Sequence, residues 1–384
     1  MVGAICALAL LAATAACTSE TAQGSGTTTT AAVGTDGTSP TTTSTSTTAP
    51  PDPSLEPAWP VPDWEVVDPA DAGVDPAALE AIAARAEEAG SDCLVLTRDG
   101  RIVGEWYWNG TTPDTEREAF SVTKSITSTL VGIAEDLGYL DIDQPASDFV
   151  EEWKGTPSEA ITIRNLLSND SGRFQTAHSD YVQMATIEED KTAYAIGLTQ
   201  EHEIGTFWVY NNAAIQVLEA VLERATGTDV NAFAAEHLFG PLGMTTHIST
   251  DAAGNTLTFM GAQMSCRDMA RFGLLHLRGG EWNGTQVVPE QWVTDATSPS
   301  TELTPGYGYL WWLFGAGDEE TETAPGQPTV APGIEGYAAI GLGGQVIAVV
   351  PEHDVVVTRL GPVSAGQFSL YDLLDRVQNQ LIVD

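Results

Sequence analysis

Apolar side chains follow a helical pattern in the stretch that begins at Ser121. They recur at intervals of four, three and four residues, which is the spacing of one face of a helix. Gly138 follows the last of them directly and is a typical C-cap. The pattern predicts a helix whose apolar face is buried in the protein core. Its apolar positions are Ile126, Leu130, Ile133 and Leu137.

The hydrophobic pattern before this helix predicts a shorter helix and a β hairpin. Asp75 and Pro76 have the residue types of an N-cap and a first helical position, and Gly90 is placed to end the helix. Apolar runs at 93–97 and 102–107 then flank a polar Arg-Asp-Gly turn. Two such runs around a tight turn are typical of antiparallel strands.

The pattern is mostly helical from residue 146 to residue 297 and becomes strand-like near Pro305. We expect the N-terminal hairpin to join the C-terminal strands in one mostly antiparallel sheet, with the helical middle as a separate lobe. The expected fold class is therefore α+β. The strand-like runs are 307–314, 337–340, 345–350 and 355–360, and a closing helix covers 370–381.

The first 54 residues have a different composition. Residues 1–17 form a short apolar run that ends at Cys17, which predicts a secretory signal with Cys17 as a lipid-attachment site. A simple secretory signal cleaved nearby is the alternative. Residues 18–54 are rich in Thr, Ser, Gly and Pro and predict a disordered linker, so the folded domain is expected over 55–384. We expect an extracellular protein, either secreted or anchored to the outer face of the cell membrane by the lipid.

The chain is strongly acidic, with 15 Lys and Arg against 53 Asp and Glu and a formal net charge of −38. This charge disfavours nucleic acid as a partner, and it leaves the lipid as the expected membrane contact. Cys93 and Cys266 remain once the N-terminal cysteines are set aside. In an oxidising compartment they are candidates for a disulfide, but their spacing does not show that they meet. The oligomeric state stays open.

Candidate chemistry begins with Ser121 and Lys124, which helical spacing places on one face. A hydroxyl and an ammonium can therefore meet there. One interpretation is a capping serine and a lysine that extends to solvent. The other is a serine nucleophile activated by a lysine whose pKa is lowered by burial. The motif alone leaves both interpretations open.

A second base is offered by the motif Tyr210-Asn211-Asn212, which comes just before another predicted helix. Beside a lysine ammonium, Tyr210 could have a depressed pKa and accept the serine proton, while Asn212 would hold the carbonyl region of the substrate. Tyr107 and Asn109 repeat the spacing, but they lie at a strand end and fit a hairpin better. The six histidines are scattered and are expected on the surface or in loops rather than in a catalytic triad.

Further motifs, in the same order along the chain, resemble those of the serine β-lactamase and penicillin-binding-protein-like hydrolases. The class C β-lactamase branch, with its esterases, D-amino peptidases and aminohexanoate-dimer hydrolases, is the most similar part of that family. The resemblance runs from about Asp71 to the end of the chain. Besides the serine and tyrosine motifs, it rests on the segments 166–172, 241–244, 267–273 and 343–345.

The resemblance implies roles for the candidate residues. Ser121 would be the nucleophile, Lys124 its helper and Tyr210 the general base. The family's fold places a helical lobe beside an antiparallel sheet, with the active site between the two. No metal and no organic cofactor is implied.

The family's third motif is a strand with Lys-Thr-Gly or a variant, and the matching segment here is Leu342-Gly343-Gly344-Gln345. The resemblance implies an oxyanion hole from the N–H groups of Gln345 and Ser121, with glycines that let a substrate approach the backbone. A simple bulge or hairpin turn would also explain these glycines. Leu342 replaces the lysine that helps to hold the substrate carboxylate in β-lactamases.

We therefore expect a serine hydrolase that cleaves an ester or amide bond of a small molecule or short peptide through an acyl-enzyme on Ser121. Activity of the β-lactamase or D-alanyl carboxypeptidase type is one alternative. A non-catalytic module that binds a cell-wall peptide is the other.

Overall fold

The computed structural model describes residues 57–315, 335–363 and 368–383. The predicted signal at 1–17, the predicted linker at 18–54 and the candidate lipidation site Cys17 lie outside the described residues. The described part belongs to one compact unit, Leu55–Asp384.

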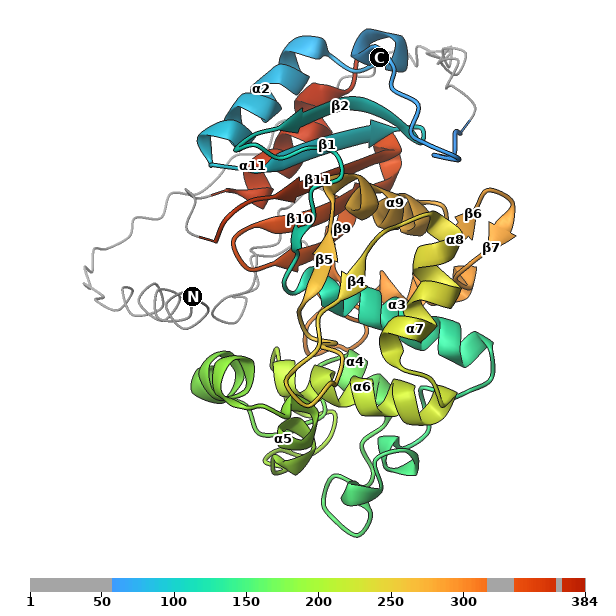
Figure 1. Ribbon diagram of the computed structural model, residues 1–384, viewed down its shortest axis with the longest axis vertical. Helices are drawn as coiled ribbons and strands as arrows, with labels where there is room; N and C mark the ends of the chain where they lie inside the picture. Colours follow the sequence, from blue (N-terminus) through green and yellow to red (C-terminus); the bar gives the residue numbers. More distant parts are fainter. Residues whose placement is uncertain (1–56, 316–334, 364–367, 384) are drawn as a thin grey trace, which may run out of the picture. The chain divides into compact units, whose positions relative to one another are not determined.

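A six-stranded antiparallel sheet forms one half of this unit (Figure 1). The strand order is β2-β1-β11-β10-β9-β8. The N-terminal hairpin therefore lies beside the C-terminal strands, which confirms the predicted sheet and the α+β class. The strands are β1 (Cys93–Arg98), β2 (Arg101–Tyr107), β8 (Trp312–Phe314), β9 (Gly336–Gly341), β10 (Gln345–Val350) and β11 (Val355–Leu360).

The central strands are apolar throughout because both faces of the sheet are covered. In β10, Val346 and Ala348 pack into one apolar cluster, while Ile347 and Val349 pack into the other. The alternation follows from the two-residue period of a strand. Helices α2 (Pro76–Glu88) and α11 (Leu370–Arg376) cover one face, and α9 (Cys266–Leu277) covers the other (Figure 1).

The serine helix α3 (Val122–Asp136) joins the sheet to the helical lobe, because it packs on β9, β10 and the lobe helix α6 (Asn212–Thr226). Its C-cap is Leu137, one residue before the predicted cap Gly138, which follows with a φ of 76°. Leu137 is exposed, whereas the other three apolar positions of the predicted face are buried. The remaining α-helices of the described ranges are α4 (Ile163–Leu167), α5 (Lys191–Gly197), α7 (Val230–Ala234), α8 (Gly240–Leu242) and α10 (Glu290–Ala296). π-Helical turns lie at Ser179–Ile187, Ala235–Phe239 and Val377–Leu381, and 3-10 turns lie at Pro69–Ala72, Ala146–Asp148, Glu151–Trp153 and Pro351–His353. Within the described ranges, no helix is long and apolar enough to span a membrane.

Two further predictions are corrected by the fold. The strand predicted over 307–314 is shorter, because Leu310 has a φ of 61° and the chain turns back before β8. His276 is buried in the core, not on the surface, and its imidazole contacts the Thr129 hydroxyl at 3.1 Å. Short strands were not predicted: β3 (Arg117–Glu118), β4 (His247–Ile248) and β5 (Ala262–Met264) form a small sheet, and β6 (Glu281–Trp282) pairs with β7 (Thr285–Gln286).

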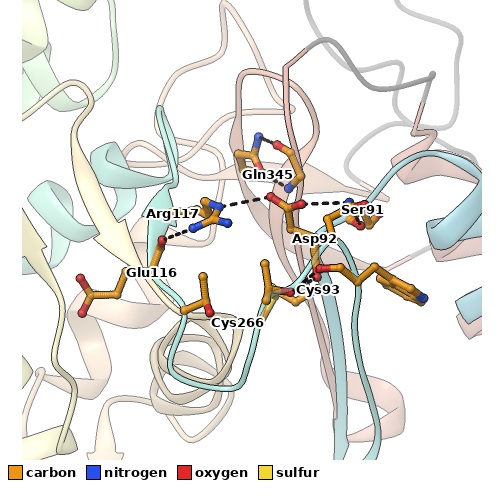
Figure 2. A network of polar contacts seen from close by, with 12 residues as sticks. Ser91, Asp92, Cys93, Glu116, Arg117, Cys266 and Gln345 are labelled. Carbon is orange, nitrogen blue, oxygen red and sulfur yellow. Dashed lines mark hydrogen bonds and ion pairs between the residues drawn. A yellow bond between two sulfur atoms is a disulfide. The ribbon is translucent and has the colours of Figure 1, made fainter.

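Cys93 and Cys266 form a disulfide that links the first residue of β1 to the first residue of α9. The two cysteines are 173 residues apart in the sequence, so the bond fastens the N-terminal hairpin to a helix from much later in the chain. Figure 2 shows them near the ion pair between Arg117 and Asp92, whose Nε and Oδ2 atoms are 3.3 Å apart.

Removal of this disulfide should destabilise the protein, because the bond restricts the unfolded chain over a long loop. We expect the double variant Cys93→Ala/Cys266→Ala to lose about 2–5 kcal/mol of unfolding free energy. Guanidinium denaturation in oxidising buffer measures this loss. A reductant should lower the midpoint of the wild type and leave that of the double variant unchanged; equal midpoints for both proteins in oxidising buffer would contradict the expectation.

Candidate active site

The Ser121 side chain lies at the start of α3 but does not cap the helix. Phe120, just before it, has a φ of 49°, which a non-glycine residue adopts only at a cost in strain. The Thr123 hydroxyl donates to the Phe120 carbonyl oxygen at 2.6 Å and so helps to hold this turn. The interpretation of Ser121 as a helix cap is therefore wrong, and its hydroxyl oxygen accepts a hydrogen bond from Lys124 instead.

Lys124 is buried, with 1% of its surface exposed. Its Nζ donates to Ser121 Oγ at 2.8 Å and to the carbonyl oxygen of Phe259 at 2.6 Å. Burial disfavours the ammonium and lowers the pKa of Lys124 to about 7. The lysine does not extend to solvent, and near neutral pH it can accept a proton.

Tyr210 is the third side chain of this cluster, after Ser121 and Lys124. Its ring centroid lies 4.9 Å from Lys124 Nζ. The pKa of Tyr210 is raised, because desolvation of its hydroxyl outweighs the opposite effect of the Ser121 side chain. The expectation of a depressed pKa is therefore wrong.

The turn that carries Tyr210 is held by buried polar side chains. Asn211 caps α6 by accepting from the Ala214 N–H at 2.8 Å, and its own N–H donates to Asn169 Oδ1 at 3.1 Å. Trp312 from β8 stacks on the Tyr210 ring with 5.7 Å between centroids. The position of the tyrosine is thus fixed from both the helical lobe and the sheet.

Asp180 is a member of the site that the sequence did not reveal. Its carboxylate is fully buried, and Oδ2 accepts the main-chain N–H of Asn212 at 2.8 Å. Burial raises the pKa of Asp180 to about 6, while the charge of Lys124 acts in the opposite direction. One aspartate in a chain rich in acidic residues has no distinguishing pattern.

Asn212 is the first residue of α6 and is 2% exposed. Within the described structure, its Oδ1 atom is buried without a hydrogen-bond donor. The structure therefore places Asn212 beside Asp180 and next to Tyr210, and its contact with a substrate carbonyl stays a prediction.

The glycine-rich segment connects β9 to β10 beside the serine turn. A Cβ atom on Gly341 would lie 2.2 Å from the Ala119 carbonyl oxygen, so the two backbones touch two residues before Ser121. Gly343 and Gly344 have φ values of 83° and 78°, which glycine adopts without strain. The next residue, Gln345, is buried, and Leu342 is exposed.

The Gln345 side chain has a structural role, in addition to the oxyanion-hole role predicted for the main-chain N–H of this residue. Its side-chain Nε2 donates to the carbonyl oxygens of Leu342 at 3.0 Å and Gly361 at 2.6 Å, and its Oε1 accepts the Gly361 N–H at 2.8 Å. Gln345 therefore braces the turn with its side chain. The oxyanion-hole role of its main-chain N–H stays a prediction.

The alternative tyrosine motif lies elsewhere. Tyr107 ends β2, and its hydroxyl donates to Glu105 Oε2 at 2.5 Å. Glu105 also accepts from Arg267 Nη2 at 2.7 Å. Tyr107 therefore belongs to the ion-paired surface of the hairpin and α9. Among the described residues, no group of three His, Cys, Asp or Glu side chains could hold a metal ion.

A serine, a buried lysine and a tyrosine thus meet between an antiparallel sheet and a helical lobe. This fold is of the β-lactamase/transpeptidase-like class.

Comparison with known proteins agrees with this class. The family model described as Beta-lactamase matches residues 79–361, which is more than half of the chain. The chain belongs to the β-lactamase family and is a hydrolase of that family. It is 26% identical over 306 residues to the 6-aminohexanoate-dimer hydrolase of Paenarthrobacter ureafaciens, with 72% of this chain and 74% of that protein covered.

Solved structures show the same fold at low sequence identity. A penicillin-binding protein from Bacillus halodurans superposes with a TM-score of 0.60 and 16% identity, covering 77% of this chain and 98% of its own. A β-lactamase from Mycobacterium bovis superposes with a TM-score of 0.55 and 19% identity, covering 78% and 96%.

The buried lysine should be visible in the pH dependence of stability. Between pH 7 and the ordinary lysine pKa, folded Lys124 is neutral while the unfolded chain still binds its proton, so stability rises with pH. We expect the wild type to gain roughly 2 kcal/mol over Lys124→Met between pH 7 and pH 9. Denaturation of both proteins at several pH values measures this difference. The exposed Lys154→Met variant is the control, and parallel pH curves for wild type and Lys124→Met would refute the expectation.

Proposed function

We propose that the protein is a serine hydrolase that cleaves an ester or amide bond through an acyl-enzyme on Ser121. The observation that carries this proposal is the 2.8 Å contact from Lys124 Nζ to Ser121 Oγ. It is supported by the lowered pKa of the lysine, which allows a neutral amine next to the hydroxyl near pH 7.

In the proposed acylation, neutral Lys124 accepts the Ser121 proton while Oγ attacks the carbonyl carbon. The tetrahedral intermediate then collapses, and the bond to the leaving alcohol or amine breaks. The leaving group receives the proton that Lys124 accepted from Ser121. In this proposal Tyr210, which stays protonated because its pKa is raised and whose ring lies 4.9 Å from Lys124 Nζ, passes that proton on. Water then attacks the carbonyl carbon of the acyl-enzyme. Lys124 and Tyr210 move a proton from this water to Ser121 Oγ, and the acid product is released.

The negative oxygen of the intermediate needs hydrogen-bond donors. The Ser121 N–H is one candidate. The segment from Gly341 to Gln345 supplies the other, because it begins in contact with Ala119 beside the serine turn. We infer that one of its N–H groups completes the oxyanion hole, with that of Gln345 as the predicted donor.

The substrate is expected to be a small molecule or short peptide. Leu342 occupies the place of the lysine that holds the substrate carboxylate in β-lactamases, which favours a neutral ester or amide. The relative from Paenarthrobacter, named as a 6-aminohexanoate-dimer hydrolase, supports an amide. Hydrolysis of β-lactams or D-alanyl peptides is the second candidate, supported by the family itself.

We further propose that the protein works outside the cytoplasm. The disulfide between Cys93 and Cys266 supports this location, because such bonds form and persist in oxidising compartments. Attachment through a lipid at Cys17 is part of the same proposal.

Loss of the nucleophile should abolish catalysis without unfolding the protein. We expect Ser121→Ala to lower hydrolysis of short-chain nitrophenyl esters by at least about a thousandfold, because it removes the atom that forms the acyl-enzyme. Labelling by a fluorophosphonate probe, read by mass spectrometry, should likewise disappear. Ser128→Ala, a change of another buried serine of α3, is the control. Turnover that survives in Ser121→Ala would refute the proposal, and a folded wild type without any adduct would favour a peptide-binding module.

Turnover of nitrocefin by the same proteins separates the two substrate candidates. We expect ester or amide hydrolysis to exceed it by a large factor, because Leu342 cannot pair with the carboxylate of a β-lactam.

The lowered pKa of Lys124 also predicts how the reaction rate depends on pH. We expect kcat/KM to rise with pH and to be half-maximal near pH 7, where Lys124 becomes neutral. The Asp180 carboxylate raises the pKa of Lys124, so Asp180→Asn should move the midpoint to lower pH. The exposed Glu201→Gln variant should leave it in place. A rate that is flat from pH 6 to pH 8 would contradict Lys124 as the proton acceptor.

A further inference from the structure

The main-chain oxygen that binds the Lys124 amine belongs to a tight turn, the 256–259 turn. Lys124 Nζ donates to the Phe259 carbonyl oxygen at 2.6 Å. Just before it in the chain, the Thr258 N–H donates to the Thr256 carbonyl oxygen at 3.0 Å. In the described structure, no helix or strand includes these residues. The position of the Phe259 carbonyl therefore depends on the side chains that bind the turn.

Gln216 of α6 binds the 256–259 turn at two points, and none of its surface is exposed. Its Oε1 accepts the Thr258 N–H at 3.1 Å, and its Nε2 donates to the Thr256 carbonyl oxygen at 2.9 Å. These partners fix the orientation of the amide, because a main-chain N–H can only donate and a carbonyl can only accept. Nε2 also donates to the hydroxyl of Thr192 at 2.9 Å, which ties Gln216 to α5.

Thr127 of the serine helix α3 binds the same turn. Its hydroxyl donates to the Thr258 carbonyl oxygen at 2.8 Å, and the Thr258 hydroxyl donates to the Ile215 carbonyl oxygen at 3.0 Å. Thr127 and Thr258 are both fully buried. Thr258 is thus bound through its N–H, its carbonyl and its hydroxyl. Because a peptide group is planar, the held Thr258 carbonyl fixes the peptide plane that leads into Phe259.

The chain after Phe259 is bound again at Ala262, whose N–H donates to the Thr123 hydroxyl at 2.9 Å. Gly261 lies between the two and has a φ of 98°. Glycine restricts the backbone least, so this connection transmits little constraint. The contacts at Thr258 therefore constrain the Phe259 carbonyl oxygen more closely than the chain that follows it.

The Phe259 carbonyl oxygen acts on Lys124 in two ways. It binds one N–H of the amine, which limits rotation about the Cε–Nζ bond and helps to direct the lone pair of the neutral amine to Ser121 Oγ. It also favours the ammonium, because a charged donor makes the stronger hydrogen bond to a carbonyl. A displaced carbonyl would leave a base that is both weaker and less well oriented.

We propose that Gln216 is a positioning residue for Lys124, and that it acts together with Thr127 through the Phe259 carbonyl oxygen. The proposal rests on the proposed serine hydrolase function. In the described structure, the Gln216 amide is hydrogen-bonded to the 256–259 turn and to Thr192, and not to a reacting group. Its effect on the chemistry is therefore indirect.

Two variants test the proposal in the full-length protein. Gln216→Met removes both hydrogen bonds to the 256–259 turn at similar side-chain length, so it leaves little space for water. Thr127→Val removes the hydroxyl that binds the Thr258 carbonyl and changes the shape of the side chain little.

Each variant has a matched control. Gln286→Met changes another glutamine that binds main-chain carbonyl groups, because its Nε2 donates to Gly279 at 2.7 Å and to Val288 at 2.6 Å beside the β6–β7 hairpin. Thr129→Val changes another buried threonine of α3, whose hydroxyl donates to the Ser125 carbonyl oxygen at 2.9 Å and not to the 256–259 turn.

The measurement is kcat with a nitrophenyl ester at about pH 8.5, divided by the concentration of sites that a fluorophosphonate titrates to completion. We expect Gln216→Met to lower kcat per titrated site by about ten- to thirtyfold, with KM changed less than about twofold, because the base is misplaced. The midpoint of the kcat/KM profile should move to lower pH by about half a unit, because the ammonium loses an acceptor. Thr127→Val should show both changes to a smaller extent, and both controls should keep the wild-type values.

A purely structural role gives a different result. Gln216→Met would then unfold at lower temperature and titrate fewer sites, but each titrated site would keep the wild-type kcat and pH midpoint. That result, in Gln216→Met or in Thr127→Val if Gln216→Met does not fold, overturns the proposal. A midpoint that moves to higher pH also overturns it, because water has then reached the amine. Ser121→Ala on the same substrate is the separate test of the function: if it retains turnover, the function fails, whatever Gln216 does.

Discussion

The burial of the Lys124 amine is the constraint on which the site depends. The shift of its pKa from 10.5 to about 7 corresponds to roughly 5 kcal/mol of preference against the charged form. Two acceptors, Ser121 Oγ and the Phe259 carbonyl oxygen, hold the amine in place. Solvent access would restore the ordinary pKa, and the lysine would remain protonated beside the serine.

The position of helix α3 maintains this burial. The helix lies between the sheet and α6, and its small polar side chains bind to the surrounding chain. The Thr127 hydroxyl donates to the Thr258 carbonyl oxygen at 2.8 Å, which places the adjacent Phe259 carbonyl over the lysine. The Ser125 hydroxyl donates to the Leu310 carbonyl oxygen at 2.7 Å, just before β8 and Trp312. The lowered pKa of Lys124 therefore depends on the packing of α3.

Sequence patterns predicted the fold and the central residues because both have local signatures. The spacing of Ser121 and Lys124, the Asp-Gly hairpin and the apolar runs of β10 and β11 are all set by neighbouring residues. The supporting contacts have no such signature. Phe259 contacts Lys124 through its main-chain oxygen and through its ring, whose centroid lies 5.7 Å from Nζ, and Asp180 is recognised as part of the site only through partners that are distant in the sequence. The sign of the Tyr210 pKa shift also escaped prediction, because it depends on how closely the folded chain surrounds one hydroxyl.

Electrostatics around the site bears on the kind of substrate that it can accept. The chain carries a formal net charge of −38, and Asp180 adds a carboxylate within reach of Lys124. An anionic substrate must approach against this field. Leu342, the residue that the sequence resemblance sets against the lysine of the third motif in β-lactamases, is exposed and carries no charge to offset such a cost. A neutral ester or amide meets no such barrier, because it carries no charge when it approaches the site.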